Sequence, residues 1–191
     1  MGCLLLLLLF AQQPGSEPVY KFGTTVVQPL GFKGQIYHLH RNTEWLPDFR
    51  KLKPVGSIYT PVLNVPPQRF DQGFPGVTKR FEWFAIDYTA RFWIANPGTY
   101  RFSLLSDDGS RLYLDDRLVI ENDGVHAVRE DRGSAELSAG MHRIRVSYFQ
   151  GPRFEVALVL KVATGAQELH LFSTDDFKPP PDADFRYEPR P

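Results

Sequence analysis

The chain has 191 residues, with 22 basic and 22 acidic side chains and therefore no formal net charge. This length is enough for one sizeable domain with its own core. The balanced charge, with no basic stripe, argues against a nucleic-acid-binding surface. Aromatic residues are plentiful, and 15 glycines and 16 prolines are spread along the chain. This composition favours an all-β domain with many turns and few helices.

The N-terminus carries an unbroken apolar run, Leu4 to Phe10, which is too short to cross a bilayer. Residues 1–11 are therefore predicted to be a signal peptide cleaved near Ala11, which places the protein in a secreted, periplasmic or cell-surface location. The usual positive charge before the run is missing, which leaves open a start codon assigned too far downstream. Cys3 is the only cysteine, so the processed chain would have no disulfide and no thiol ligand. Residues 12–22 are predicted to be a flexible leader.

A single domain is predicted over residues 23–175. Its first strand is expected around residues 35–40. Residues 44–81 contain six prolines and no regular periodicity, so an irregular segment is expected there. A loop of this length in a compact domain either packs or binds something, and its aromatic and aliphatic residues favour packing.

From Phe81 onward the strand signals are regular. The stretch FEWFAIDYTARFWI ends at the turn residues 96–98, and TYRFSLL then alternates between two faces. RLYL and RLVI flank Asp115-Asp116, which suits a hairpin turn because aspartate tolerates left-handed conformations. A further turn is expected near residues 139–140.

Alternation also predicts which side chains of these strands face the core. The inward set comprises Tyr100, Phe102, Leu104, Ile144, Val146, Tyr148, Phe154, Val156, Leu158, Leu160 and Val162, and the outward set comprises Arg143, Arg145 and Ser147. Strands of this length, separated by turns, are typical of an antiparallel sandwich or barrel. Residues 176–191 form a Pro-rich tail, expected to be extended and anchored through Phe177.

A second aspartate pair, Asp107-Asp108, is followed by Gly109. Asp-Gly is a turn signal, and a turn alone could explain these residues. The alternative is a metal site, because Ca²⁺ prefers several oxygen ligands in a flexible geometry. Adjacent carboxylates on a strand point to opposite faces, so a loop would have to redirect them. The spacing does not match a helix-loop-helix calcium loop, so another loop would have to complete such a site.

Three segments together resemble the protective-antigen (PA-fourteen) domain: LLSDDGSRLYLDDRLVIENDG, LSAGMHRIRVSYFQG and FEVALVL. That module occurs in the anthrax toxin component, in fungal cell-surface adhesins and attached to glycosidases. LPDFRKLKPVGSIYTPVLNVPPQRFDQGFPGV and RFEWFAIDYTARFWI are similar to the upstream half of bacterial members. The resemblance covers about residues 30–175. It implies an all-β fold, an antiparallel β-sandwich with jelly-roll-like topology.

The resemblance also implies a calcium site. In the sugar-binding members an Asp-Asp pair joined by a cis peptide binds Ca²⁺, and the ion holds vicinal hydroxyls of a sugar. The matching positions here are Asp107 and Asp108. A second loop of the family supplies a side-chain oxygen, which Gln150 could provide, with backbone carbonyls near Pro152 and Phe154. The segment GPR is shorter than the specificity loops of fungal adhesins, which bears on sugar affinity more than on calcium. The predicted sugar-contacting residues are Asn122, Asp123, His126, Gly151 and Arg153.

Other polar residues have plainer interpretations. Asn122 and Asp123 can bond to the backbone of a turn within ENDGVH. His38 and His40 would share a face of a strand, but no neighbouring residue offers a third zinc ligand.

Catalysis has little support in the sequence. Glu82 and Asp87 are acidic, as glycosidase chemistry requires, but both lie in a stretch that reads as a structural strand. No nucleophile elbow or phosphate-binding loop is present. Trp45, Trp83 and Trp93 could form a sugar-stacking platform, although core packing is the commoner use of tryptophan.

The sequence therefore predicts a secreted, non-enzymatic, calcium-dependent carbohydrate-binding module with a glycan or cell-surface polysaccharide as partner. The first alternative is a structural or protein-interaction domain of the cell envelope that binds no sugar. The second is an accessory domain of a glycosidase. No nucleic-acid partner and no transmembrane segment are expected.

Overall fold

A computed structural model describes residues 31–77 and 80–181, so the predicted signal peptide and leader lie outside the described residues. The described chain is nearly all β. Its strands are β1 Phe32–His38, β2 Gly56–Thr60, β3 Asn64–Arg69, β4 Phe84–Ile94, β5 Gly98–Asp107, β6 Ser110–Leu114, β7 Arg117–Asn122, β8 Arg129–Leu137, β9 Gly140–Gln150, β10 Glu155–Thr164 and β11 His170–Leu171. Two short 3-10 helices, η1 Phe49–Lys51 and η2 Phe70–Gln72, interrupt them. Within this part of the chain no helix is long and apolar enough to span a membrane.

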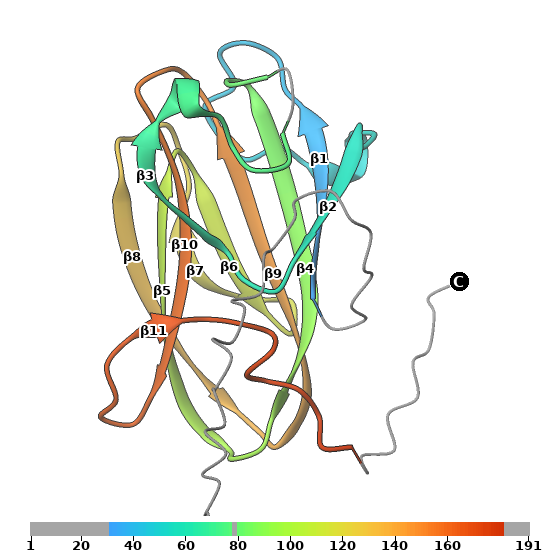
Figure 1. Cartoon of the computed structure of the whole chain (residues 1–191), viewed down its shortest axis with the longest axis vertical. Coiled ribbons are helices and arrows are strands. Elements are labelled where there is room, and N and C mark those ends of the chain that lie inside the picture. The colour runs from blue at the N-terminus through green and yellow to red at the C-terminus, as the bar shows by residue number, and fades with distance from the viewer. Residues whose placement is uncertain (1–30, 78–79, 182–191) are drawn as a thin grey trace, which may run out of the picture.

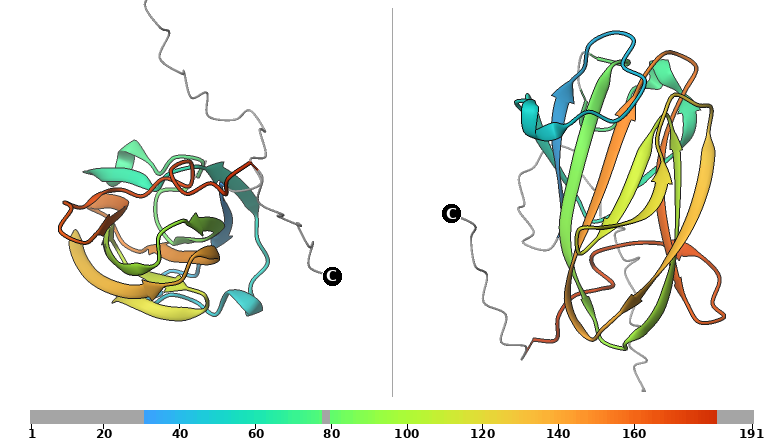
Figure 2. Two further views of the ribbon diagram at one scale, coloured as in Figure 1. Left: turned by 90° about the horizontal axis from the view of Figure 1, so that it is seen from below. Right: turned by 180° about the vertical axis from the view of Figure 1, so that it is seen from behind.

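The strands form two antiparallel sheets that face each other (Figures 1 and 2). One sheet has the order β2-β1-β4-β9-β6-β7, and the other has the order β11-β10-β5-β8, with β3 pairing along β10. The predicted antiparallel β-sandwich is confirmed. Strands adjacent in a sheet are often distant in sequence, as with β4 and β9, so the connections cross between the sheets.

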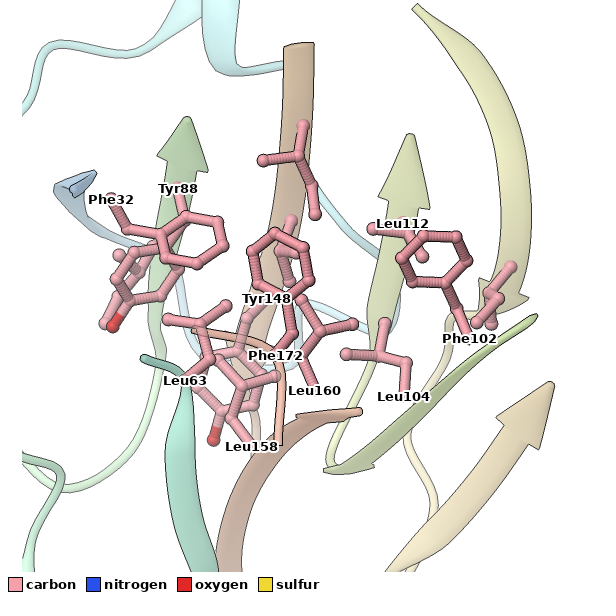
Figure 3. Packing of buried hydrophobic residues seen from close by; sticks show 14 of the residues in the cluster. Phe32, Leu63, Tyr88, Phe102, Leu104, Leu112, Tyr148, Leu158, Leu160 and Phe172 are labelled. Atoms are coloured by element: carbon pink, nitrogen blue, oxygen red, sulfur yellow. The ribbon is translucent and has the colours of Figure 1, made fainter. Parts of the chain in front are cut away.

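The core lies between the sheets and is rich in aromatic rings (Figure 3). The residues of β5, β9 and β10 that are predicted to face inward are buried, but so are many of the residues between them, as in the run Val156–Leu160 of β10. Phe74 stacks on Tyr148 at a ring-centroid distance of 5.1 Å, and Phe92 meets Phe172 edge-on at 5.5 Å. Such pairs add to the hydrophobic burial of large rings.

One residue differs from its predicted position, and another keeps its predicted orientation but is buried. Phe154 was expected to face the core, but it precedes β10, has a φ of 129° and is 83% exposed. Ser147 lies on the outer face of its sheet, as predicted, yet it is buried. Its hydroxyl donates to Asp87 at 2.8 Å, and the guanidinium of neighbouring Arg145 lies 5.7 Å from the Phe49 ring. The segment predicted to be irregular therefore packs over this outer face.

That irregular segment is also less irregular than expected. It contains β2, β3 and both 3-10 helices, and β1 begins at Phe32, earlier than predicted. β3 carries two prolines, which is compatible with a strand paired on one side only. The prolines of this segment made its strands harder to predict from the sequence, but the strands form nonetheless.

The pair Asp115-Asp116 forms the β6–β7 hairpin turn, as predicted. Both residues have positive φ, 46° and 67°, as a two-residue hairpin of this kind requires. Asp115 accepts hydrogen bonds from the Arg143 backbone N–H at 2.8 Å and approaches His142 Nδ1 at 2.6 Å. The turn geometry and these contacts explain the presence of Asp115-Asp116 without a metal ion.

Candidate calcium and glycan site

The other aspartate pair lies where β5 passes into β6. Asp107 ends β5 opposite Ala157, and Asp108 and Gly109 connect it to β6. The peptide bond between Asp107 and Asp108 is cis. β9 ends at Gln150 on the same end of the sandwich, which is drawn at the top of Figure 1. Loops from distant parts of the sequence thus converge on this pair.

Asp108 is held by two backbone donors from two loops. Its Oδ1 accepts from the His126 N–H at 3.1 Å, and its Oδ2 accepts from the Gly151 N–H at 2.8 Å. The side chain of Asp108 therefore ties the loop after β7 to the loop after β9.

Asp107 is surrounded by polar groups of β9 and β10. The Tyr148 hydroxyl lies 2.8 Å from the Asp107 carbonyl oxygen and 2.6 Å from Gln150 Oε1. Gln150 Nε2 donates to the Glu155 carbonyl at 3.0 Å. Asp107, Asp108 and Gln150, predicted as a group, are indeed adjacent.

The electrostatics of the pair are unfavourable in the absence of a cation. Asp107 and Asp108 are only 4% and 3% exposed. Burial, then the charges of Asp108 and Glu155, raise the pKa of Asp107 to about 7, although hydrogen bonds from Gln150 and Val128 lower it. Burial likewise raises the pKa of Asp108, against the two backbone donors. A buried carboxylate favours its neutral form unless a positive charge compensates it.

The donor set fits a calcium ion. No Lys or Arg of the described residues forms an ion pair with either carboxylate, and the charge of His126 has the smallest of the effects on the pKa of Asp108. Carboxylate, amide and carbonyl oxygens are the hard ligands that Ca²⁺ accepts. No three His, Cys, Asp or Glu side chains in residues 31–77 and 80–181 come together in a way that could hold a metal. An ion here would therefore depend on two carboxylates assisted by neutral oxygens.

Two of the predicted sugar-contacting residues are buried supports. The Asn122 side chain donates to Ser106 Oγ at 3.0 Å and accepts from Arg129 Nε at 2.5 Å. Asp123 Oδ1 accepts from the backbone N–H groups of Leu46 and Gly124. Neither side chain is free to reach a ligand, so we assign both to shaping the loop, which agrees with the turn interpretation.

The other three predicted contacts lie nearer the surface or on the pair itself. Gly151 provides a backbone donor to Asp108, as described above. Both ring nitrogens of partly exposed His126 contact carbonyl oxygens, at 2.8 Å to Ala127 and 3.0 Å to Asn122. Arg153 is exposed and lies 3.7 Å from Glu82. Of these residues, Arg153 has the greatest freedom to contact a ligand.

Sequence reasoning missed Tyr148 and Gly109 as parts of the site. Tyr148 precedes Gln150 by two residues on one face of β9, so strand periodicity could have found it. Gly109 has no room for a side chain, because a Cβ there would lie 2.3 Å from Phe149 Cε1 and 2.9 Å from the Gly124 nitrogen. This close approach depends on loop packing and leaves no pattern in the sequence.

Replacing Tyr148 by Phe tests the hydroxyl that joins Asp107 to Gln150. We expect a loss of about 1 to 2 kcal/mol in unfolding free energy, because buried acceptors lose their donor. Calcium affinity should fall several-fold, because both predicted ligands lose a shared anchor. Denaturant unfolding and calcium titration measure the two effects. Tyr88→Phe, in the same core but away from the site, should leave calcium affinity unchanged; equal affinity in both variants would contradict the prediction.

The comparisons with known proteins bear on the fold and the family of the chain. No curated protein matches the chain. Among solved structures, an anti-sigma factor domain-containing protein aligns at 20% identity and a TM-score of 0.62, covering 83% of this chain and 51% of that one. The chain thus spans about half the length of that protein.

Two adhesin domains have the same fold. A PA14 sugar-binding domain from an RTX adhesin aligns at 15% identity and a TM-score of 0.62, covering 78% of this chain and 97% of that one. The Epithelial Adhesin 9 A domain from Candida glabrata, in complex with Galb1-3GlcNAc, aligns at 12% identity and a TM-score of 0.54, covering 78% and 88%. At these identities the likeness shows a shared fold.

The family is shown by the sequence itself. The family model described as "PA14 domain" matches residues 64–178, which is more than half of the chain. Those residues run from β3 to the segment that follows β11 and include both aspartate pairs. The chain therefore belongs to the PA14 domain family.

Proposed function

We propose that this PA14 domain is a non-catalytic glycan-binding module that works outside the cell or on its surface and depends on Ca²⁺. The observation that carries the proposal is the buried Asp107-Asp108 pair, with which no Lys or Arg of residues 31–77 and 80–181 forms an ion pair. Two adjacent buried carboxylates are costly as a structural device alone, whereas they suit a divalent cation.

Asp107 and Asp108 would hold the ion, with Gln150 supplying a further oxygen. Bound Ca²⁺ would offset the carboxylate charges and offer open coordination positions to sugar hydroxyls. The chain's own part is to position the ligands: backbone donors hold Asp108, and Tyr148 and Gln150 hold Asp107. The Phe154 carbonyl already accepts from the Phe70 N–H at 3.2 Å, so it is less free than the sequence suggested.

The comparisons support the sugar-binding part of this proposal. One structural neighbour is named as a sugar-binding domain of an adhesin, and another as an adhesin domain in complex with a disaccharide. Neighbours of this kind also favour a location outside the cell. They describe those proteins, so the activity of this chain has to be measured directly.

Calorimetric titration with Ca²⁺ tests the metal. Wild-type protein should give a binding isotherm, and calcium at about a thousand times the dissociation constant should add about 4 kcal/mol to the unfolding free energy. The double variant Asp107→Asn, Asp108→Asn should show neither effect while remaining folded. The matched control is Asp115→Asn, Asp116→Asn, which alters the hairpin pair and should retain the calcium response.

A glycan array, run with calcium and then with chelator, tests the sugar. Binding that the chelator abolishes supports the proposal. Calcium binding without any glycan would favour the cell-envelope protein-interaction module, and turnover of a glycoside would favour the glycosidase alternative. A silent calcium titration of the wild type would falsify the metal proposal.

A further inference from the structure

Trp45 is an exposed tryptophan at the rim of the candidate site. It lies in the loop between β1 and β2 and is 62% exposed, whereas Trp83 and Trp93 are partly buried. Its ring lies against Gly124, where a Cβ would be 3.2 Å from Trp45 Cζ3. One side of the Trp45 indole thus contacts the protein, while most of this large apolar group is exposed to solvent. Tryptophan is more often largely buried.

The loop that carries Trp45 is fixed by a buried carboxylate. Asp123 Oδ1 accepts from the Leu46 N–H at 2.9 Å and from the Gly124 N–H at 2.8 Å. Its Oδ2 forms an ion pair with Arg111 Nη2 at 3.1 Å, although the geometry does not qualify as a hydrogen bond. Asp123 thus holds the residue after Trp45 and the glycine under its ring.

The same contacts connect Trp45 to the aspartate pair. A Cβ on Gly109, the residue after Asp108, would lie 2.6 Å from Asp123 Oδ1. The His126 N–H, two residues after Gly124, donates to Asp108. Trp45 therefore stands beside the loop that holds Asp108 on this end of the sandwich.

A pyranose ring has polar edges and apolar C–H faces. When hydroxyls on one edge face a metal, an adjacent aromatic ring can cover the apolar face, as in other ligand pockets that combine few polar groups with aromatic walls. We propose that Trp45 is the apolar wall of the glycan site and stacks on a pyranose whose hydroxyls bind at Asp107 and Asp108. This inference rests on the proposed function.

The test uses the full chain with Ca²⁺ and a panel of methyl glycosides of galactose, mannose, glucose and fucose as probes. Trp45→Ala should leave the calcium isotherm unchanged and raise the dissociation constant for the bound glycoside roughly threefold to tenfold. Trp45→Phe should recover part of the affinity. Glycoside should change the tryptophan fluorescence of the wild type but not of Trp45→Phe. Tyr59→Ala, another exposed aromatic, on edge strand β2, is the matched control and should bind as wild type.

The outcomes separate this inference from the function on which it rests. If wild type binds calcium and a glycoside, and Trp45→Ala binds both equally well, Trp45 is not part of the site and only this inference is overturned. If wild type binds calcium but no glycoside, or no calcium, the proposed function and this inference fail together.

Discussion

In calcium-free solution near pH 8, Asp107→Asn is expected to be more stable than the wild type, by on the order of 4 kcal/mol. The pKa of Asp107 is about 7 in the folded protein, against about 4 in an unfolded chain. Between about pH 4 and pH 7 the folded state therefore holds a proton that the unfolded state has released, and near pH 8 the folded wild type has to give that proton up. The stability contributed by that proton is fully present below about pH 4 and is lost as the pH rises through about 7. The total loss is about 1.4 kcal/mol for each unit by which the folded and unfolded pKa values differ.

The measurement is denaturant unfolding of both proteins at several pH values between about 4 and 8, with a chelator present. The advantage of Asp107→Asn should shrink to a small fraction near pH 4, where the folded wild-type carboxyl is neutral and about half of the unfolded chains also have it neutral. Saturating calcium should reverse the order at pH 8, because only the wild type retains both carboxylates for the ion. An unchanged difference between wild type and Asp107→Asn across this range contradicts the prediction.

This result would explain why one aspartate pair differs from the other. Asp115-Asp116 is largely open to solvent and has Arg143 and His142 as partners. Asp107-Asp108 is buried, and among the described residues neither carboxylate forms an ion pair with a Lys, Arg or His side chain. Both pairs have the same dipeptide sequence, so only the surroundings in the fold distinguish a turn from a candidate ion site.

Much of the fold follows from local patterns in the sequence. Alternation in β5, β9 and β10 predicts the strands and the residues that face the core, because one face of each sheet packs against the other sheet. The hairpin at Asp115 is predictable for a similar reason, since its turn chemistry is local. Alternation does not predict how exposed the outer face is, because tertiary contacts decide this: Ser147 on β9 points outward as predicted, yet it is buried.

The site was predictable only in part. The residues themselves suggested Asp107 and Asp108 as candidate ligands, and the family resemblance added Gln150. The structure adds the backbone donors at His126 and Gly151, which have no residue signature because any residue supplies an N–H. It also shows Asn122 to be an internal support, although its sequence neighbourhood suggested a surface loop.

The largest loss of stability away from the site is expected for Phe172→Ala, about 3 to 5 kcal/mol, as is typical when a fully buried aromatic is removed. Phe172 is completely buried, and its ring lies 5.8 Å from Phe32, 5.5 Å from Phe92 and 5.0 Å from Phe177. It follows β11, so the loss would show that this late segment belongs to the core. Denaturant midpoints at constant m-value measure it.

Phe177→Ala is the matched control, because Phe177 is only partly buried and lies just beyond the predicted domain end at residue 175. Its backbone carbonyl accepts from the Trp93 N–H at 2.6 Å, a bond that the substitution leaves in place, so a smaller loss is expected. Phe172 packs against residues at the end of the sandwich remote from Asp107, so a folded Phe172→Ala variant should retain the calcium response. A loss below about 1 kcal/mol for Phe172→Ala would contradict the prediction, because the cavity left by a fully buried phenyl ring costs more than this. It would mean that the core does not depend on this segment.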